Sequence, residues 1–241
     1  MKLISLWPLF LLVGFVASGT ARATTTYESF KPTMTAGTAY TIDALKLHPT
    51  QFSVGWREIE HKRTKFDAMS TAEVIAYLQQ KDVPVVIGPG GVPYLTDGHH
   101  TSSALLVCAH SDKTVYGHIL ANWSDMADTE FWARMQKQGY TFLFHATGAN
   151  RRSAELPGSL ADMKPDSYRG LAWAVMQAGG FKEIKPPAIF FQEFYWADFF
   201  RTRLKWNDAD EAAFALALQE ALTMAHSPAA ANLPGYISPK P

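Results

Sequence analysis

The stretch that decides the fold is residues 85–100, Val85-Val86-Ile87-Gly88-Pro89-Gly90-Gly91-Val92-Pro93-Tyr94-Leu95-Thr96-Asp97-Gly98-His99-His100. The β-branched run at 83–87 predicts a buried strand, and the glycine-rich segment 89–91 predicts a tight turn into a second strand. Asp97-Gly98 ends that strand, and residues 99–109 favour a helix. Because the first turn of a helix has free backbone N–H groups, residues 98–101 are predicted to bind an anion such as phosphate.

The N-terminus has the pattern of a secretory signal peptide. Lys2 precedes a nearly unbroken apolar run over residues 3–17, and Ala21-Arg22-Ala23 fits a small-x-small cleavage site. We expect residues 1–23 to be removed and the mature chain to be periplasmic or secreted. The apolar run is shorter than the roughly 20 residues that span a bilayer. An uncleaved anchor is the alternative, and no transmembrane span is expected after cleavage.

The charge balance argues against a chromosome-binding role. The chain has 22 basic and 22 acidic residues, and residues 1–23 contain Lys2 and Arg22, so the mature chain has 20 basic and 22 acidic residues, a net charge of −2. Proteins that bind duplex DNA usually carry a clear basic excess. No stable binding to duplex DNA is therefore expected. The single cysteine, Cys108, is interpreted as a small buried residue of the 99–109 helix.

The composition divides the chain into five segments. They are the signal peptide 1–23, a flexible arm 24–38, a core 39–146, a helical C-terminal part 147–226 packed on the core, and an extended tail 227–241. Strands are predicted at 39–47, 114–122 and 140–145, and helices at 71–80, 129–137, 167–178, 190–204 and 208–226, with Asn207 as the cap of the last. The charged segment 51–69 has sparse apolar residues and no assigned element.

An ordered set of short motifs lies between residues 40 and 205. They are Leu47-His48-Pro49-Thr50-Gln51, Val54-Gly55, Arg57-Glu58-Ile59, Lys62, Val86-Ile87-Gly88-Pro89-Gly90-Gly91, Asp97-Gly98-His99-His100, Tyr168-Arg169-Gly170-Leu171-Ala172 and Glu193-Phe194-Tyr195-Trp196-Ala197-Asp198-Phe199-Phe200-Arg201. In this order they resemble the family of putative ParB-like nucleases, in the ParB/sulfiredoxin superfamily. The resemblance implies an α+β fold: a small ParB/sulfiredoxin-like mixed sheet with packed helices and a helical C-terminal extension.

The resemblance also implies a nucleotide-binding site whose loop-to-helix motif cradles phosphates. Members of the superfamily include CTP-binding partition proteins, ATP-dependent sulfiredoxins, a free serine kinase and proteins called nucleases, so the fold does not fix the reaction. This chain has Asp-Gly-His-His where partition proteins have a Gly-Glu-Arg-Arg type of motif and where sulfiredoxins keep a cysteine. The Asp-Gly-His-His form is similar to the serine kinase branch.

The candidate phosphate site is the 97–101 motif with Lys62. Gly98 and Thr101 offer backbone N–H groups, and His99 and His100 offer charge-assisted hydrogen bonds when protonated. One ring is expected to face the phosphate and the other to support the loop. The alternative is that Asp97 caps the helix and both histidines are solvated.

The catalytic candidates are Glu58, His100 and Asp97. Glu58 lies at the Arg-Glu-hydrophobic position of the resemblance and is the first choice for the base that positions a hydroxyl or water, with Glu60 second. Asp97 is the candidate ligand for Mg²⁺ or another divalent cation beside phosphate oxygens. Histidines 99, 100, 118 and 145 leave a zinc site as a less favoured option. A solvated charged face of the 56–65 stretch is the alternative for Glu58.

Charged residues also interrupt the aromatic 190–204 helix. They include Glu193, Asp198 and Arg201, and Arg169 is predicted to pair with Glu193 or Asp198 if this helix is buried. The sequence leaves two roles open for Arg169, Glu193 and Arg201: a structural ion pair or a contact with substrate. Trp196 is interpreted as a core residue. A platform on which a base stacks is the less favoured role.

The sequence therefore predicts phosphoryl chemistry on a phosphate-bearing small molecule or a nucleic-acid fragment, with a nucleotide and a divalent metal as possible cofactors. The reaction is either phosphodiester hydrolysis or transfer from a nucleotide. Export favours hydrolysis, because nucleoside triphosphates are scarce outside the cell, whereas the motif favours transfer. The alternatives are a module that binds a nucleotide or anion without turnover, and an envelope protein that binds a partner.

Overall fold

The computed structural model describes residues 25–144 and 149–238. The predicted signal peptide lies outside these residues. Within them, no helix is long and apolar enough to cross a bilayer.

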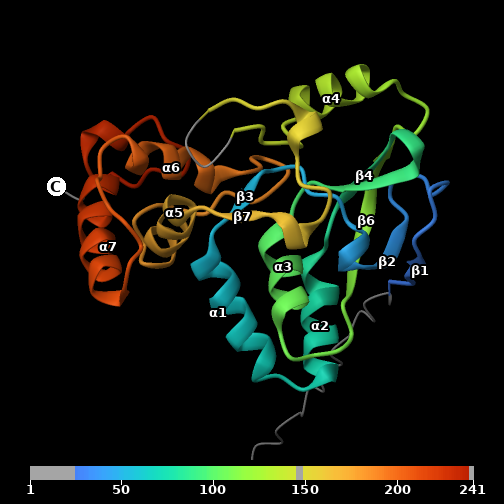
Figure 1. Cartoon of the computed structure of the whole chain (residues 1–241), viewed down its shortest axis with the longest axis horizontal. Helices are drawn as coiled ribbons and strands as arrows, with labels where there is room; N and C mark the ends of the chain where they lie inside the picture. The colour runs from blue at the N-terminus through green and yellow to red at the C-terminus, as the bar shows by residue number, and fades with distance from the viewer. Residues whose placement is uncertain (1–24, 145–148, 239–241) are drawn as a thin grey trace, which may run out of the picture.

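A mixed five-stranded sheet forms the centre of the first half of the chain (Figure 1). Its strands lie in the order β1 (Glu28–Ser29), β2 (Ala39–Asp43), β6 (Thr114–Asn122), β4 (Val85–Gly88) and β5 (Val92–Leu95). β1 is parallel to β2 and β4 to β6, while the β2–β6 and β4–β5 pairs are antiparallel. This mixed sheet and its helices confirm the predicted α+β class. β1 lies within the segment predicted as an arm.

Residues 85–100 fold as the sequence predicts. β4 is fully buried and reverses through a short 3-10 turn at Pro89–Gly91, where Gly90 and Gly91 have φ of 71° and 80°. β5 then leads through Asp97-Gly98 into α3 (His99–Val107). Gly98 has φ of 89°, a left-handed conformation that glycine adopts without a Cβ clash. The turn chemistry of the sequence thus places the start of α3 beside the ends of the central strands.

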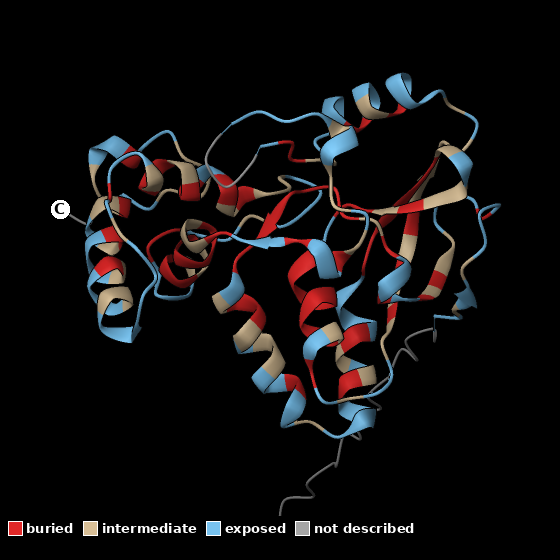
Figure 2. Cartoon of the chain, viewed as in Figure 1, coloured by how far each residue is buried: buried red, intermediate tan, exposed pale blue. Residues whose placement is uncertain are grey.

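Helices cover both faces of the sheet. On one side lie α1 (Trp56–Asp67), α2 (Thr71–Lys81) and α3, and α3 is the most thoroughly buried of the three (Figure 2). On the other side α4 (Asp128–Lys137) packs Phe131 against Val86. Val85 and Ile87 belong to the core under α1–α3, because successive strand residues point to opposite faces.

The helix α1 was not predicted. It lies in the segment that the sequence left unassigned, because only two of its apolar side chains, Ile59 and Phe66, are buried. The third buried position of α1 holds a carboxylate, Glu58. A helix that buries a charge has a weak apolar stripe, and periodicity therefore does not reveal it.

The C-terminal helices form a second hydrophobic cluster, beside α1 at the left of Figure 1. They are α5 (Ser167–Gln177), α6 (Gln192–Arg201) and α7 (Glu211–Ala225). A two-stranded parallel pair, β3 (Ser53–Val54) with β7 (Lys164–Pro165), connects the two halves, and α1 contacts α5. Gly55 is the point of closest approach, since a Cβ there would lie 2.9 Å from the backbone of Gly170.

Several predicted boundaries are wrong by a few residues. The strand at 39–47 ends at Asp43, whose side chain caps a 3-10 turn at Ala44–Lys46. The cap of α7 is Asp210, which accepts from the backbone N–H of Ala213, and not Asn207. The segment 140–144 makes only isolated bridges through Phe142 and Phe144, and His145 lies outside the described residues. α3 ends at Val107, and Cys108 is buried as predicted.

Candidate functional site

The first turn of α3 lies at the edge of a pocket of about 540 Å³. The pocket also borders α1, α5 and α6, so that it joins the two halves of the chain. Most of the predicted site residues line it: Glu58, Lys62, Asp97, Gly98, His99, His100, Thr101, Arg169 and Glu193. The volume is within the range of small-molecule sites, roughly 300–1,000 Å³.

The two histidines of α3 hold the loops that precede α1. The backbone N–H of Thr50 donates to Nε2 of His99 at 3.1 Å, and the backbone N–H of Gly55 donates to Nε2 of His100 at 2.9 Å. Each Nε2 is therefore an acceptor, which assigns the proton of the neutral His99 ring to Nδ1. The Nδ1 of His100 faces a donor, Nη2 of Arg169, at 3.5 Å. Both rings support loops, which corrects the prediction that only one would.

Both rings are buried, with exposed fractions of 3% for His99 and 8% for His100. Burial, with a smaller contribution from Arg169, lowers the pKa of His99 to about 3. Burial also lowers the pKa of His100 well below its usual range, against the attraction of Glu58. The predicted charge-assisted hydrogen bonds from protonated histidines are therefore wrong at neutral pH, and so is the alternative of solvated histidines. The neutral ring of His99 still has its Nδ1–H as a donor.

A buried carboxylate lies next to His100. Glu58 Oε1 accepts from Lys62 Nζ at 2.6 Å, and Glu58 Oε2 lies 3.2 Å from Arg169 Nη1 and 3.7 Å from His100 Nε2. Burial alone would raise the pKa of Glu58, but attraction to His100 when that ring is protonated, and to the cations Arg169 and Lys62, outweighs burial and lowers the pKa to about 2. Glu58 is ionised at neutral pH, and the solvated alternative for it is wrong.

Arg169 lies between two carboxylates. Its Nη2 is 3.2 Å from Glu193 Oε1, and its Nη1 faces Glu58 at the same distance, so the predicted pair with Glu193 is confirmed. Only 4% of Arg169 is exposed, yet its Nε and Nη1 donate no hydrogen bond of proper geometry within the described part of the chain. Nη1 still faces Glu58 in an ion pair, so Arg169 brings to the pocket wall a buried positive charge shared between two carboxylates.

Desolvation disfavours the ionised form of two pocket carboxyls, those of Glu193 and Asp97. Burial raises the pKa of Glu193 despite the opposing attraction of Arg169. Asp97 is exposed at the pocket surface, but desolvation by the surrounding protein still raises its pKa. Its Oδ1 accepts from the N–H of Gly98 at 2.7 Å, and α3 has no side-chain cap, so the prediction that Asp97 caps α3 is wrong.

Four of the predicted residues lie away from this cluster. Glu60 pairs with Arg63 on the surface of α1, and Trp196 is fully buried and stacked on Phe181, which confirms its core role. Arg201 pairs with Asp166 at 2.7 Å and with Asp198. Asp198 is therefore not the partner of Arg169. These residues are not among those that line the pocket.

Sequence reasoning missed the aromatic wall of the pocket. Phe191 and Phe194 line it, and the Arg169 guanidinium lies 5.5 Å above the ring of Phe194. Phe191 has φ of 59° at the start of α6, an uncommon conformation for a bulky residue. That backbone is the reason α6 begins at Gln192 and not at 190. A phenylalanine-rich run predicts core packing, and no local signal separates core from pocket wall.

The described residues contain no group of three or more His, Cys, Asp or Glu side chains arranged to hold a metal ion. Asp97 lines the pocket, is exposed and carries no ion pair with Lys62 or Arg169. His118, considered for zinc, instead pairs with Asp82 at 2.7 Å.

The buried His99 makes stability fall in mild acid. Its pKa is about 3 in the folded chain and about 6.5 when unfolded, so the unfolded state binds more protons below pH 6.5. We expect the free energy of unfolding to fall by about 2 kcal/mol between pH 6.5 and pH 5 from this residue alone.

Urea unfolding at a series of pH values measures this fall in the free energy of unfolding. His99→Gln retains an acceptor and flattens the slope, whereas His61→Gln, at an exposed position of α1, leaves it unchanged. Equal slopes in all three proteins would contradict the assignment.

Comparisons with known proteins agree with this architecture. The family model described as "Putative ParB-like nuclease" matches residues 40–202. The crystal structure of protein Atu1540 from Agrobacterium tumefaciens is similar, with 34% sequence identity and a TM-score of 0.72, and the match covers 84% of this chain and 99% of that one. No curated protein matches the chain. The family match runs from β2 to α6 and includes every residue of the buried cluster described above, whereas β1 lies outside it. The chain therefore belongs to the family of putative ParB-like nucleases.

Proposed function

We propose that the pocket at the start of α3 binds the phosphate group of a nucleotide or a nucleic-acid fragment and carries out phosphoryl chemistry there. The observation that carries the proposal is the buried guanidinium of Arg169, which lines a pocket that also contains the first turn of α3. A guanidinium and free backbone N–H groups are both donors that suit phosphate oxygens.

Two carboxyls with opposite pKa shifts flank Arg169. The pKa of Glu58 is about 2, and that of Glu193 is raised by burial. Such pairs are typical of acid–base sites, in which one group accepts a proton and the other donates one. In hydrolysis, the oxygen of water bonds to phosphorus while the bond to the leaving oxygen breaks. The water proton goes to Glu58, and Glu193 supplies a proton to the leaving oxygen.

A bound phosphate makes Glu58 a better base. With a pKa of about 2 the free carboxylate is weakly basic. A phosphate anion beside Arg169 and Lys62 takes up part of their positive potential and also repels the carboxylate, and both effects raise the pKa of Glu58. Proton acceptance is then coupled to substrate binding. Asp97 is proposed as the ligand of Mg²⁺ or another divalent cation, whose chemistry is to neutralise charge on the phosphate oxygens.

Hydrolysis of a phosphodiester is preferred here over transfer from a nucleotide. The reason is the proposed signal peptide over residues 1–23, which places the mature chain outside the cytoplasm. Nucleic-acid fragments are available there, whereas nucleoside triphosphates are scarce. The proposed ligand is thus a phosphate-bearing small molecule or a nucleic-acid fragment, without stable binding to duplex DNA.

One observation favours a second function, binding without turnover. The low pKa of Glu58 and its ion pairs with Lys62 and Arg169 are also what a purely structural charge cluster shows. In that case the pocket senses a nucleotide or anion and forms no product.

A thermal-shift screen of the purified protein tests the phosphate site. The panel contains nucleotides, short oligonucleotides, inorganic phosphate and divalent cations, each alone and combined with Mg²⁺. A ligand at 100 times its Kd stabilises the folded state by about 2.7 kcal/mol, which raises the melting temperature measurably. Arg63→Met, on the surface of α1, is expected to keep the response. No stabilisation by any phosphate-bearing ligand would refute the proposal.

A further inference from the structure

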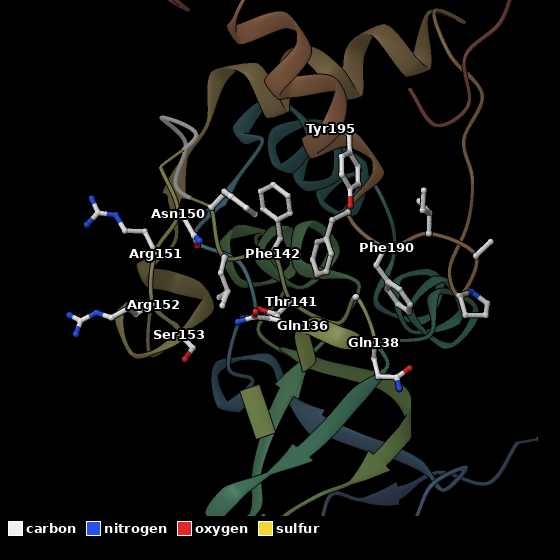
Figure 3. A pocket seen from close by; sticks show the side chains of 17 residues that line it. Gln136, Gln138, Thr141, Phe142, Asn150, Arg151, Arg152, Ser153, Phe190 and Tyr195 are labelled. Atoms are coloured by element: carbon white, nitrogen blue, oxygen red, sulfur yellow. The ribbon is translucent and has the colours of Figure 1, made fainter. Parts of the chain in front are cut away.

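A second pocket, of about 680 Å³, adjoins the proposed phosphate site (Figure 3). Its walls come from three segments: the chain after α4, residues 150–153, and the 187–191 segment with the first turns of α6. None of the residues assigned above to phosphate binding or proton transfer lines it. It needs its own explanation.

The lining of this pocket is aromatic. Phe142 is packed between Phe144 and Phe194, and Tyr195 meets Phe142 edge to face at 6.4 Å between ring centroids. Phe144 and Tyr195 are 40% and 48% exposed, which is high for aromatic side chains within a folded domain. Figure 3 shows Tyr195, Phe142 and Phe190 around one side of the pocket. A planar aromatic ligand would stack on such faces.

The charge of the lining is positive. None of the residues that form this pocket's walls is Asp or Glu, whereas Arg151 and Arg152 lie at its rim, with their guanidinium groups directed away from the aromatic side chains (Figure 3). Both arginines pair with the carboxylate of Glu155, at 3.2 and 2.9 Å. Glu155 therefore neutralises only one of the two positive charges. Side-chain amides of Gln136, Gln138 and Asn150 add donors and acceptors. A ligand with aromatic faces, polar edges and negative charge suits this combination.

The two pockets share three wall residues, Pro187, Phe190 and Phe191. Phe191 lines both, and its ring centroid lies 6.2 Å from the ring of His99 and 6.1 Å from that of Phe142. Phe190 and Pro187 also border both pockets. The left-handed backbone of Phe191 is the kind of strain that persists where the surrounding structure fixes a side chain. Phe191 is therefore a wall common to the two pockets.

We propose that the aromatic pocket beside Phe191 binds a nucleobase of a single-stranded nucleic-acid fragment whose phosphodiester lies in the first pocket. The inference rests on the proposed function and narrows its substrate class. Bases within a duplex are stacked and paired, so only an unpaired base can enter. Stacking also tolerates all four bases, because every base has a π-face.

Calorimetric binding of two matched ligands tests the proposal. The first is a deoxydinucleotide and the second is its abasic analogue, with the same sugars and phosphodiester but without bases. All proteins carry Glu58→Gln, so that neither ligand is consumed. We expect Tyr195→Ala to weaken the dinucleotide about tenfold and to leave the abasic ligand unchanged. Tyr195→Phe, which keeps the ring, is expected to restore dinucleotide binding. Leu216→Ala, which also removes an exposed apolar side chain but on α7, serves as the control.

The outcomes separate this inference from the proposed function. Equal affinity for the dinucleotide and the abasic ligand, or an equal loss of both in Tyr195→Ala, overturns the base site and leaves the phosphate site standing. Binding of a free nucleoside as tightly as of the dinucleotide, lost in Tyr195→Ala, supports the base site while it removes the phosphate site. Absence of binding by every ligand overturns both.

Discussion

Replacing Arg169 with methionine is expected to destabilise the folded chain by about 3–5 kcal/mol and to abolish phosphate binding. Methionine keeps much of the apolar stem against Phe194 but removes the guanidinium. Glu58 then keeps Lys62 as its cation, and Glu193 loses the ion pair that Arg169 supplies. Removing one partner from a buried ion pair leaves a desolvated charge, which is more costly than removing both. Urea unfolding measures the loss of stability, and calorimetry with a nucleotide measures the loss of binding.

A double variant distinguishes the structural role of Arg169 from its role in binding. Arg169→Met with Glu193→Gln removes the carboxylate that loses its partner, so part of the lost stability should return while phosphate binding stays absent. Arg63→Met is the matched surface control, since its pairs with Glu60 and Asp67 lie on the exposed side of α1. Such surface pairs contribute at most about 1 kcal/mol. Normal phosphate affinity in a folded Arg169→Met protein would rule out the proposed site.

Replacing Glu58 with glutamine is expected to reduce turnover of a phosphodiester by about 10²–10⁴-fold, the usual contribution of a positioned base. Glutamine has nearly the same shape as glutamate, and its oxygen can still accept a hydrogen bond from Lys62. It cannot take a proton from water. We therefore expect kcat to fall while KM changes little, because the phosphate is held by Arg169 and the start of α3.

The control for this prediction lies on the same helix. Glu60 pairs with Arg63 and does not line the pocket, so Glu60→Gln should keep the activity of the unmodified chain. A steady-state assay with an oligonucleotide and a small phosphodiester compares the three proteins. Full turnover in Glu58→Gln would remove Glu58 as the base. A protein that binds tightly but forms no product in any variant would favour the second function, binding without turnover.

Local sequence patterns were enough to predict most of the fold. The β4–turn–β5–α3 unit follows from a β-branched run, two glycines with positive φ and a polar break, all within residues 83–99. The start of α2 is equally local, because Ser70 and Glu73 form a capping box on their own backbone. These signals come from interactions between residues that are close together in the chain. A single sequence is therefore enough to identify them.

Part of the candidate site was also predictable. The Asp97–Thr101 motif, Glu58, Lys62 and Arg169 were identified from the motifs that carry the family resemblance, and the structure gathers them around one pocket. Arg201, Trp196 and Glu60 were candidates on the same grounds, yet they lie outside that pocket. Sequence spacing does not distinguish these two groups, since both fall on helices that carry the same motifs.

The sequence by itself determined the fold class and the presence of a phosphate-type motif at the start of α3. Only the tertiary structure decided the electrostatic state of that motif. His99 and His100 are neutral supports because α1 and the 50–55 loop bury them, and Glu58 is ionised because α5 brings Arg169 to it. The physical reason is that elements form from neighbouring residues, whereas desolvation and Coulomb interactions depend on which distant segments pack together.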